Sequence, residues 1–104
     1  MSSVQESPAF AWTCSELEIS TGLSTLVARG TVRLALRQAG LQPQEVSGQQ
    51  MAIVLREVLP QELANRAVAD AQRLCSRLAD RIVLQNLAGS DATVDAFRRL
   101  GGGK

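Results

Sequence analysis

Two sets of arginines with helical spacing are the residues of this chain best suited to bind a ligand: Arg29, Arg33 and Arg37, and Arg73, Arg77 and Arg81. Within each set the residues are four apart, so a helix would place all three on one face. Asp70 and Asp80 lie on or beside the second set, which predicts a solvated face with i, i+3 ion pairs. No acidic residue lies between Glu18 and Glu45, so the first set forms an uncompensated basic strip.

The residues that most enzymes use are missing or isolated. The chain contains no histidine, which removes Ser-His-Asp and Cys-His catalysis and most zinc sites. Its one lysine is the last residue, and the glycines at 101–103 do not precede a helix signal, so Schiff-base and phosphate-loop chemistry lack candidates. We therefore expect a protein that is not an enzyme and that uses no cofactor and no metal ion.

The two cysteines, Cys14 and Cys75, lie far apart in the sequence and lack the spacing of a metal site. Cys14 falls near the predicted start of a helix, where the helix dipole would lower the pKa of its thiol. A thiol-based redox sensor is therefore one functional hypothesis. The alternative is that both cysteines are small packed side chains in a reduced protein.

The segment 24–40 is the strongest candidate for an amphipathic helix. Apolar residues occupy well over half of its helical circumference, in two groups: Leu23, Val27, Gly30, Leu34 and Leu41, and Ala28, Val32, Ala35 and Ala39. A helix with that much apolar surface is expected to be buried on most sides. The sequence thus predicts a central helix, on which Arg29, Arg33 and Arg37 form a narrow strip open to solvent.

The beginning of the chain reads as a polar tail followed by a short helix. Residues 1–9 lack apolar periodicity. Thr13 with Glu16 three residues later has the spacing of a capping box, which predicts a helix from about residue 14 to residue 21. Gly22 is expected to break the chain before the central helix.

The second half of the chain also reads as helical. Ser47 begins a second capping-box signal before an apolar run at 48–59, for which a strand is the rival interpretation because of its β-branched residues. The segment 61–88 contains no proline or glycine and predicts one long helix, with a bend at 67–69 as the alternative. A final short helix is expected after Gly89.

These elements predict an all-α fold, a small single-domain bundle or orthogonal array of four to five helices. We expect a flexible tail at 1–12, a helical domain at 13–100 and a flexible end at 101–104. The net charge of +1 gives no general affinity for polyanions. No segment reaches the roughly 20 apolar residues of a membrane span, and no secretory signal is visible, so a cytoplasmic location is expected.

A helical protein-interaction or regulatory module is the function that these patterns favour. Arginines beside exposed leucines are typical of a protein-binding surface. The predicted partner-binding residues are Arg29, Arg33, Arg37, Leu26 and Leu36. The expected partner is either another protein with an acidic amphipathic segment or a second copy of this chain.

A DNA-binding helix-turn-helix is the alternative function. The turn Gly22-Leu23-Ser24 resembles the turn of that motif, with the arginine-bearing helix as the reader. Glu18 and Thr31 occupy positions where the motif requires core residues. A reader helix must also be mostly exposed, whereas the segment 24–40 is expected to be mostly buried. Nucleic-acid binding is therefore not expected.

Overall fold

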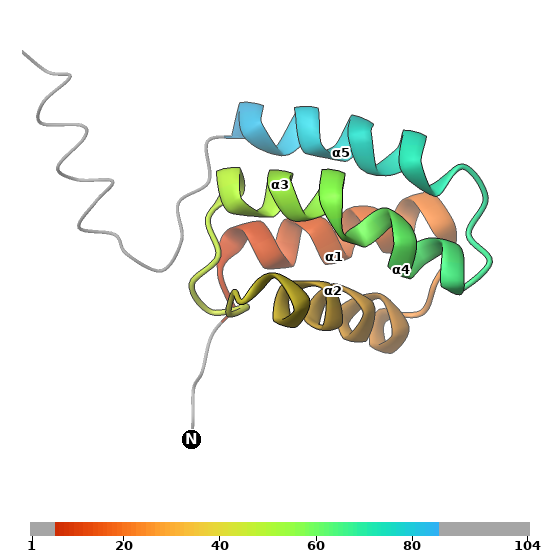
Figure 1. The fold of residues 1–104 in the computed structure, drawn as a ribbon, viewed down its shortest axis with the longest axis horizontal. Helices are drawn as coiled ribbons and strands as arrows, with labels where there is room; N and C mark the ends of the chain where they lie inside the picture. Colours follow the sequence, from red (N-terminus) through yellow and green to blue (C-terminus); the bar gives the residue numbers. More distant parts are fainter. Residues whose placement is uncertain (1–5, 86–104) are drawn as a thin grey trace, which may run out of the picture.

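The computed structural model describes residues 6–85, and five α-helices lie within that range (Figure 1). Their bounds are α1 Pro8–Thr21, α2 Thr25–Ala39, α3 Gly48–Glu57, α4 Leu59–Asn65 and α5 Ala71–Gln85. No strand occurs between residues 6 and 85. The predicted all-α fold of four to five helices is confirmed, and so is the helical interpretation of the apolar run at 48–59. The short helix expected after Gly89 lies outside the described residues.

α1 and the consecutive helices α3 and α4 form the middle of the bundle, while α2 and α5 lie on opposite sides of it (Figure 1). α1 packs against α2, α3 and α5, whereas α2 and α5 do not contact each other. The core between these helices is mainly aliphatic, and its largest fully buried side chains include Phe10, Leu17, Leu36, Met51, Leu55, Leu59, Leu63, Leu78 and Ile82. None of the helices within residues 6–85 combines the length and apolar character needed to cross a bilayer.

α1 begins six residues earlier than the sequence predicts. The Ser7 side chain accepts a hydrogen bond from the Phe10 backbone N–H (3.2 Å), and Pro8 occupies the first helical turn. This serine-proline pair is a standard helix start, since proline there gives up no helical hydrogen bond. The predicted capping box at Thr13 is wrong, because Thr13 lies inside α1 and is fully buried. The predicted tail at 1–12 therefore overlaps the folded domain from Ser7 onward.

α2 has the predicted ends but not the predicted place. The Ser24 side chain caps its N-terminus, and Gly40 ends it with a left-handed φ of 77° that glycine adopts without strain. The prediction of a central, mostly buried helix is wrong: α2 lies at the edge of the bundle (Figure 1) and buries one face only. The buried side chains are Ala28, Thr31, Val32, Ala35 and Leu36.

α3 begins at the capping box that the sequence predicts. The Ser47 hydroxyl accepts from the Gln50 N–H (3.1 Å), and the Gln50 side chain accepts from the Ser47 N–H (3.0 Å). α4 follows directly, with Pro60 in its first turn.

The single long helix predicted for 61–88 is wrong: the chain leaves the helical path around 67–69, where a bend was the alternative, and the change is a full interruption rather than a bend. α4 ends at Asn65, and α5 begins at Ala71. Ala67 and Asp70 adopt positive φ angles of 63° and 52°, which a continuing α-helix does not allow. The interruption turns the chain so that α5 can pack against α3 as well as α4.

One carboxylate is buried between α2 and α4. Glu62 is 7 % exposed, and it accepts hydrogen bonds from the Gln38 side chain (2.5 Å) and from Arg66 (3.0 Å). A buried charge is tolerated when its hydrogen-bonding capacity is satisfied in this way. These bonds help to fix α2 against the middle of the bundle.

Candidate functional site

The solvent-facing side of α2 carries three of the seven large hydrophobic side chains that are exposed within residues 6–85. Leu26 is 80 % exposed, Val27 is 41 % exposed and Leu34 is 36 % exposed. Gly30 lies midway between Leu26 and Leu34, four residues from each, so it is on the same side of the helix. A Cβ atom added at Gly30 would meet no neighbouring atom within 4 Å. We call these four residues, with Arg33 and Arg37 along one edge, the α2 outer face.

Arg29 and Arg33 are paired with a carboxylate from the beginning of the domain. Glu6 forms ion pairs with both guanidinium groups, one through each of its carboxylate oxygens. Both guanidinium groups also lie over the Phe10 ring, 5.3 and 5.6 Å from its centroid. The expectation that all three arginines of the first set are uncompensated is therefore wrong for Arg29 and Arg33.

The environment of Glu6 favours its ionised form. Burial raises the pKa of this carboxyl, but the hydrogen bonds and positive charges of Arg29 and Arg33 outweigh burial, so its pKa lies below the ordinary value of 4.5. The backbone N–H of Ser7, the next residue, donates to the Pro43 carbonyl (2.8 Å). These contacts join the beginning of the domain to the middle of α2 and to the segment that follows it.

Glu6→Gln should lower the free energy of unfolding by about 1 kcal/mol at neutral pH, because it removes the ion pairs with Arg29 and Arg33. The effect is modest because these ion pairs are partly exposed and water screens them. Since the folded-state pKa is depressed, this stabilisation is present above about pH 4.5 and is lost as the pH falls through the folded-state pKa. Urea unfolding followed by the fluorescence of the single tryptophan, Trp12, measures it. Glu57→Gln, at an exposed carboxylate with no ion pair within residues 6–85, is the matched control; equal effects of the two changes would contradict the pairing.

Arg37 has a different environment from the other two arginines of its set. No carboxylate within residues 6–85 lies within 4 Å of its guanidinium group. Together with Arg33 it lines a pocket of about 240 Å³ where α2 ends, against Gly40, Leu41, Gln42 and Pro43. A side-chain carboxylate of a partner would fit this pocket, because guanidinium groups bind carboxylates through paired hydrogen bonds.

The two leucines predicted to flank the arginines have opposite environments. Leu26 is exposed, as predicted, but Leu36 is fully buried in the core. The prediction that Leu36 is an exposed anchor is wrong, because it lies on the side of α2 that packs against the bundle. Val27, Gly30 and Leu34, which the sequence analysis assigned to the buried side, form the exposed surface beside Leu26 instead.

The second arginine set does not form the predicted i, i+3 pairs. Arg81 pairs with Glu16 of α1 (2.8 Å) and lies over the Trp12 ring, and Asp80 pairs with Arg56 of α3 (2.7 Å). Both ion pairs join residues of two different helices. The carboxylates of Glu16 and Asp80 therefore hold neighbouring helices together instead of pairing with arginines of their own helix. Arg73 and Arg77 have no ion pair within residues 6–85.

The thiols are placed where they are unreactive. Cys14 and Cys75 are free and buried. Burial raises the pKa of each thiol to about 12, and for Cys14 it outweighs the lowering effect of Arg29. The lowered pKa expected for Cys14 is therefore wrong, because α1 begins at Pro8 and Cys14 lies in its middle. Reactive cysteines are exposed and have low pKa values, so this geometry gives the redox hypothesis no support.

The connection between α1 and α2 is the short turn on which the helix-turn-helix alternative rests. Gly22 ends α1 with a left-handed φ of 77°, and Leu23 and Ser24 complete the turn. Thr31 is buried, and its hydroxyl donates to the Val27 carbonyl (2.7 Å), so this position does belong to the core. Among the described residues, no group of three His, Cys, Asp or Glu side chains is arranged to hold a metal ion.

No family model, curated protein or solved structure matches this chain. The class that the observed architecture defines is a small all-α domain.

Proposed function

We propose that this domain is a non-catalytic protein-interaction module whose α2 outer face binds an acidic amphipathic helix of a partner protein. The observation that carries the proposal is the 80 % exposure of Leu26, on the same side of α2 as Val27, Gly30 and Leu34 and opposite the one face that α2 buries. Contiguous exposed apolar surface bordered by charged residues is typical of protein-binding sites.

The shape of the face suits a helix. Leu26, Gly30 and Leu34 are spaced four residues apart, so they form one stripe along the α2 axis. Because Gly30 has no side chain, a partner helix can approach the α2 backbone closely between the two leucines. The apolar stripe of a partner helix, with residues at i, i+3, i+4 and i+7, matches this arrangement.

The charge of the face favours an acidic partner. α2 contains three arginines and no acidic residue, and Glu6 supplies one negative charge to Arg29 and Arg33. The face therefore retains positive charge, concentrated at Arg37 and the pocket where α2 ends. Two copies of α2 would bring like charges together, which disfavours self-association through this face. DNA is also disfavoured, because the Glu6 carboxylate and the central leucines offer nothing to a phosphate backbone.

The test uses the full chain and a fluorescent amphipathic peptide of about 20 residues, with leucines on one face and glutamates on the other, since shorter helices are marginal in water. Fluorescence anisotropy should show saturable binding. Leu26→Ala should weaken it at least about fivefold, the effect of losing an interface anchor, and Arg37→Gln should weaken it by about threefold or more. Leu84→Ala, at an 82 % exposed leucine of α5, is the matched control and should leave the affinity unchanged.

Three outcomes would contradict the proposal. Equal affinity for a peptide whose glutamates are replaced by glutamines would remove the role of charge. Concentration-dependent dimerisation that Leu26→Ala abolishes would identify a second copy as the occupant. Tight binding to duplex DNA that weakens steeply with salt, with no binding to the peptide, would favour the helix-turn-helix alternative.

A further inference from the structure

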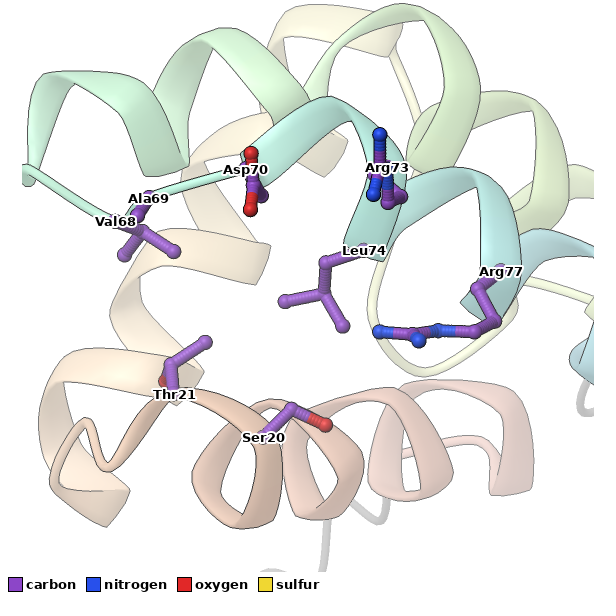
Figure 2. Close-up of a pocket in the computed structure, with 8 residues that line it drawn as sticks. All are labelled: Ser20, Thr21, Val68, Ala69, Asp70, Arg73, Leu74 and Arg77. Carbon is purple, nitrogen blue, oxygen red and sulfur yellow. The ribbon is translucent and has the colours of Figure 1, made fainter.

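A second candidate site lies between α1 and α5, and no residue of α2 contributes to it. It is a pocket of about 300 Å³, at the lower end of the range for small-molecule sites. Three parts of the chain line it: the last turn of α1, the interruption between α4 and α5, and the first two turns of α5 (Figure 2). The lining residues are Ser20, Thr21, Val68, Ala69, Asp70, Arg73, Leu74 and Arg77.

The pocket contains charges of both signs that do not neutralise each other. Asp70 lies at one rim, whereas the Arg77 side chain extends toward Leu74 and Ser20 (Figure 2). No carboxylate oxygen of Asp70 lies within 4 Å of the guanidinium nitrogens of Arg73 or Arg77. The neighbouring charges of α5 are used elsewhere, since Asp80 pairs with Arg56 and Arg81 pairs with Glu16. The charged groups of α5 that have no ion pair within residues 6–85 are those at this pocket.

We propose that this pocket binds a small zwitterion of the amino-acid type. Its carboxylate would bind the guanidinium groups of Arg77 and Arg73, and its ammonium group would donate to the Asp70 carboxylate. A short aliphatic side chain would contact Leu74 and Val68, which supply apolar surface in the same pocket. A simple anion satisfies only the two arginines and is repelled by Asp70, so the pair of opposite charges selects a ligand that carries both.

Isothermal titration of the full chain with valine, isovalerate and isobutylamine tests the two charges separately, because each amine or acid lacks one charged group of valine. Valine should bind at least about tenfold more tightly than either, which corresponds to one charge-assisted hydrogen bond. Arg77→Gln should weaken valine binding by about tenfold, and Asp70→Asn should remove the preference for valine over isovalerate. Arg56→Gln, at an exposed arginine of α3 that lines neither pocket, makes the same change of net charge as Arg77→Gln and should have no effect.

Equal binding of valine, isovalerate and inorganic phosphate would overturn the proposal and leave a general anion site. Absence of binding by valine at concentrations up to its solubility would also overturn it. Either result leaves the α2 outer face untouched, because that surface is tested with a different ligand and different variants.

Discussion

Replacing Phe10 by alanine should lower the free energy of unfolding by about 3–5 kcal/mol, the usual cost of removing a fully buried aromatic side chain. Phe10 is 0 % exposed, and the guanidinium groups of Arg29 and Arg33 lie over its ring. The substitution therefore leaves a cavity and removes two cation–π contacts together. Small domains have a total stability of about 5–15 kcal/mol, so the variant should lose a large part of its stability.

Urea unfolding followed by far-ultraviolet circular dichroism measures this effect. Ile19→Ala is the matched control, because Ile19 lies in the same helix and is 74 % exposed, and it should change stability by less than about 0.5 kcal/mol. If Phe10 belonged to a tail outside the domain, the two substitutions would have equally small effects. That result would contradict the helix start at Pro8 and the position of Glu6 beside α2.

The second large effect is a loss of stability at alkaline pH. Burial raises the pKa of Cys14 and of Cys75 from 9.0 to about 12, so in the folded protein both thiols stay protonated at pH values where the unfolded chain ionises them. The stabilisation is full below about pH 9 and is lost as the pH rises toward about pH 12. At about pH 10 the loss should be about 1.4 kcal/mol per thiol, or about 3 kcal/mol for the two together.

Comparing the free energy of unfolding at about pH 8 and about pH 10, under reducing conditions, measures this loss. A variant that carries both Cys14→Ala and Cys75→Ala should show almost no change over that range, although it starts from a lower stability because two small cavities are created. A wild-type protein whose stability is as insensitive to pH as that of the double variant would contradict the burial of the thiols.

The local signals of the fold were predictable because each depends on a few neighbouring residues. The caps at Ser24 and Ser47 and the helix ends at Gly22 and Gly40 all require only the chemistry of one turn. The start of α1 was equally local, since Ser7-Pro8 is a standard cap. It was missed because Thr13 with Glu16 offers a second helix-start signal nearby, and only the packing of Phe10 decides between the two.

The orientation of α2 was not predictable in the same way. A helical wheel shows which residues are apolar, but it does not show which side packs when apolar residues cover most of the circumference. In the structure Ala28, Thr31 and Ala35 face the bundle together with Leu36, whereas Leu26 faces solvent. Small residues at the contact allow helices to lie close together, and this long-range requirement is not visible in one segment.

The pairing of charges also depended on tertiary structure. Glu6 is 23 residues from Arg29 and 27 residues from Arg33, and Arg81 is 65 residues from Glu16. No spacing rule connects such distant residues, so the sequence could identify Arg37 as a candidate binding residue but could not separate it from Arg29 and Arg33. The pocket between α1 and α5 was missed for the same reason, because it is formed by segments that only the fold brings together.

The most direct test of the α2 outer face as the binding surface is a two-dimensional ¹⁵N–¹H NMR titration of the full chain with the acidic amphipathic peptide. We expect the largest shift changes at the backbone N–H groups of Leu26, Gly30 and Leu34 and at the side-chain Nε–H of Arg37. The N–H groups of α5, on the opposite side of the bundle, should change little. Shift changes centred on α5, or none at a peptide concentration that saturates the anisotropy signal, would contradict the assignment of α2 as the docking helix.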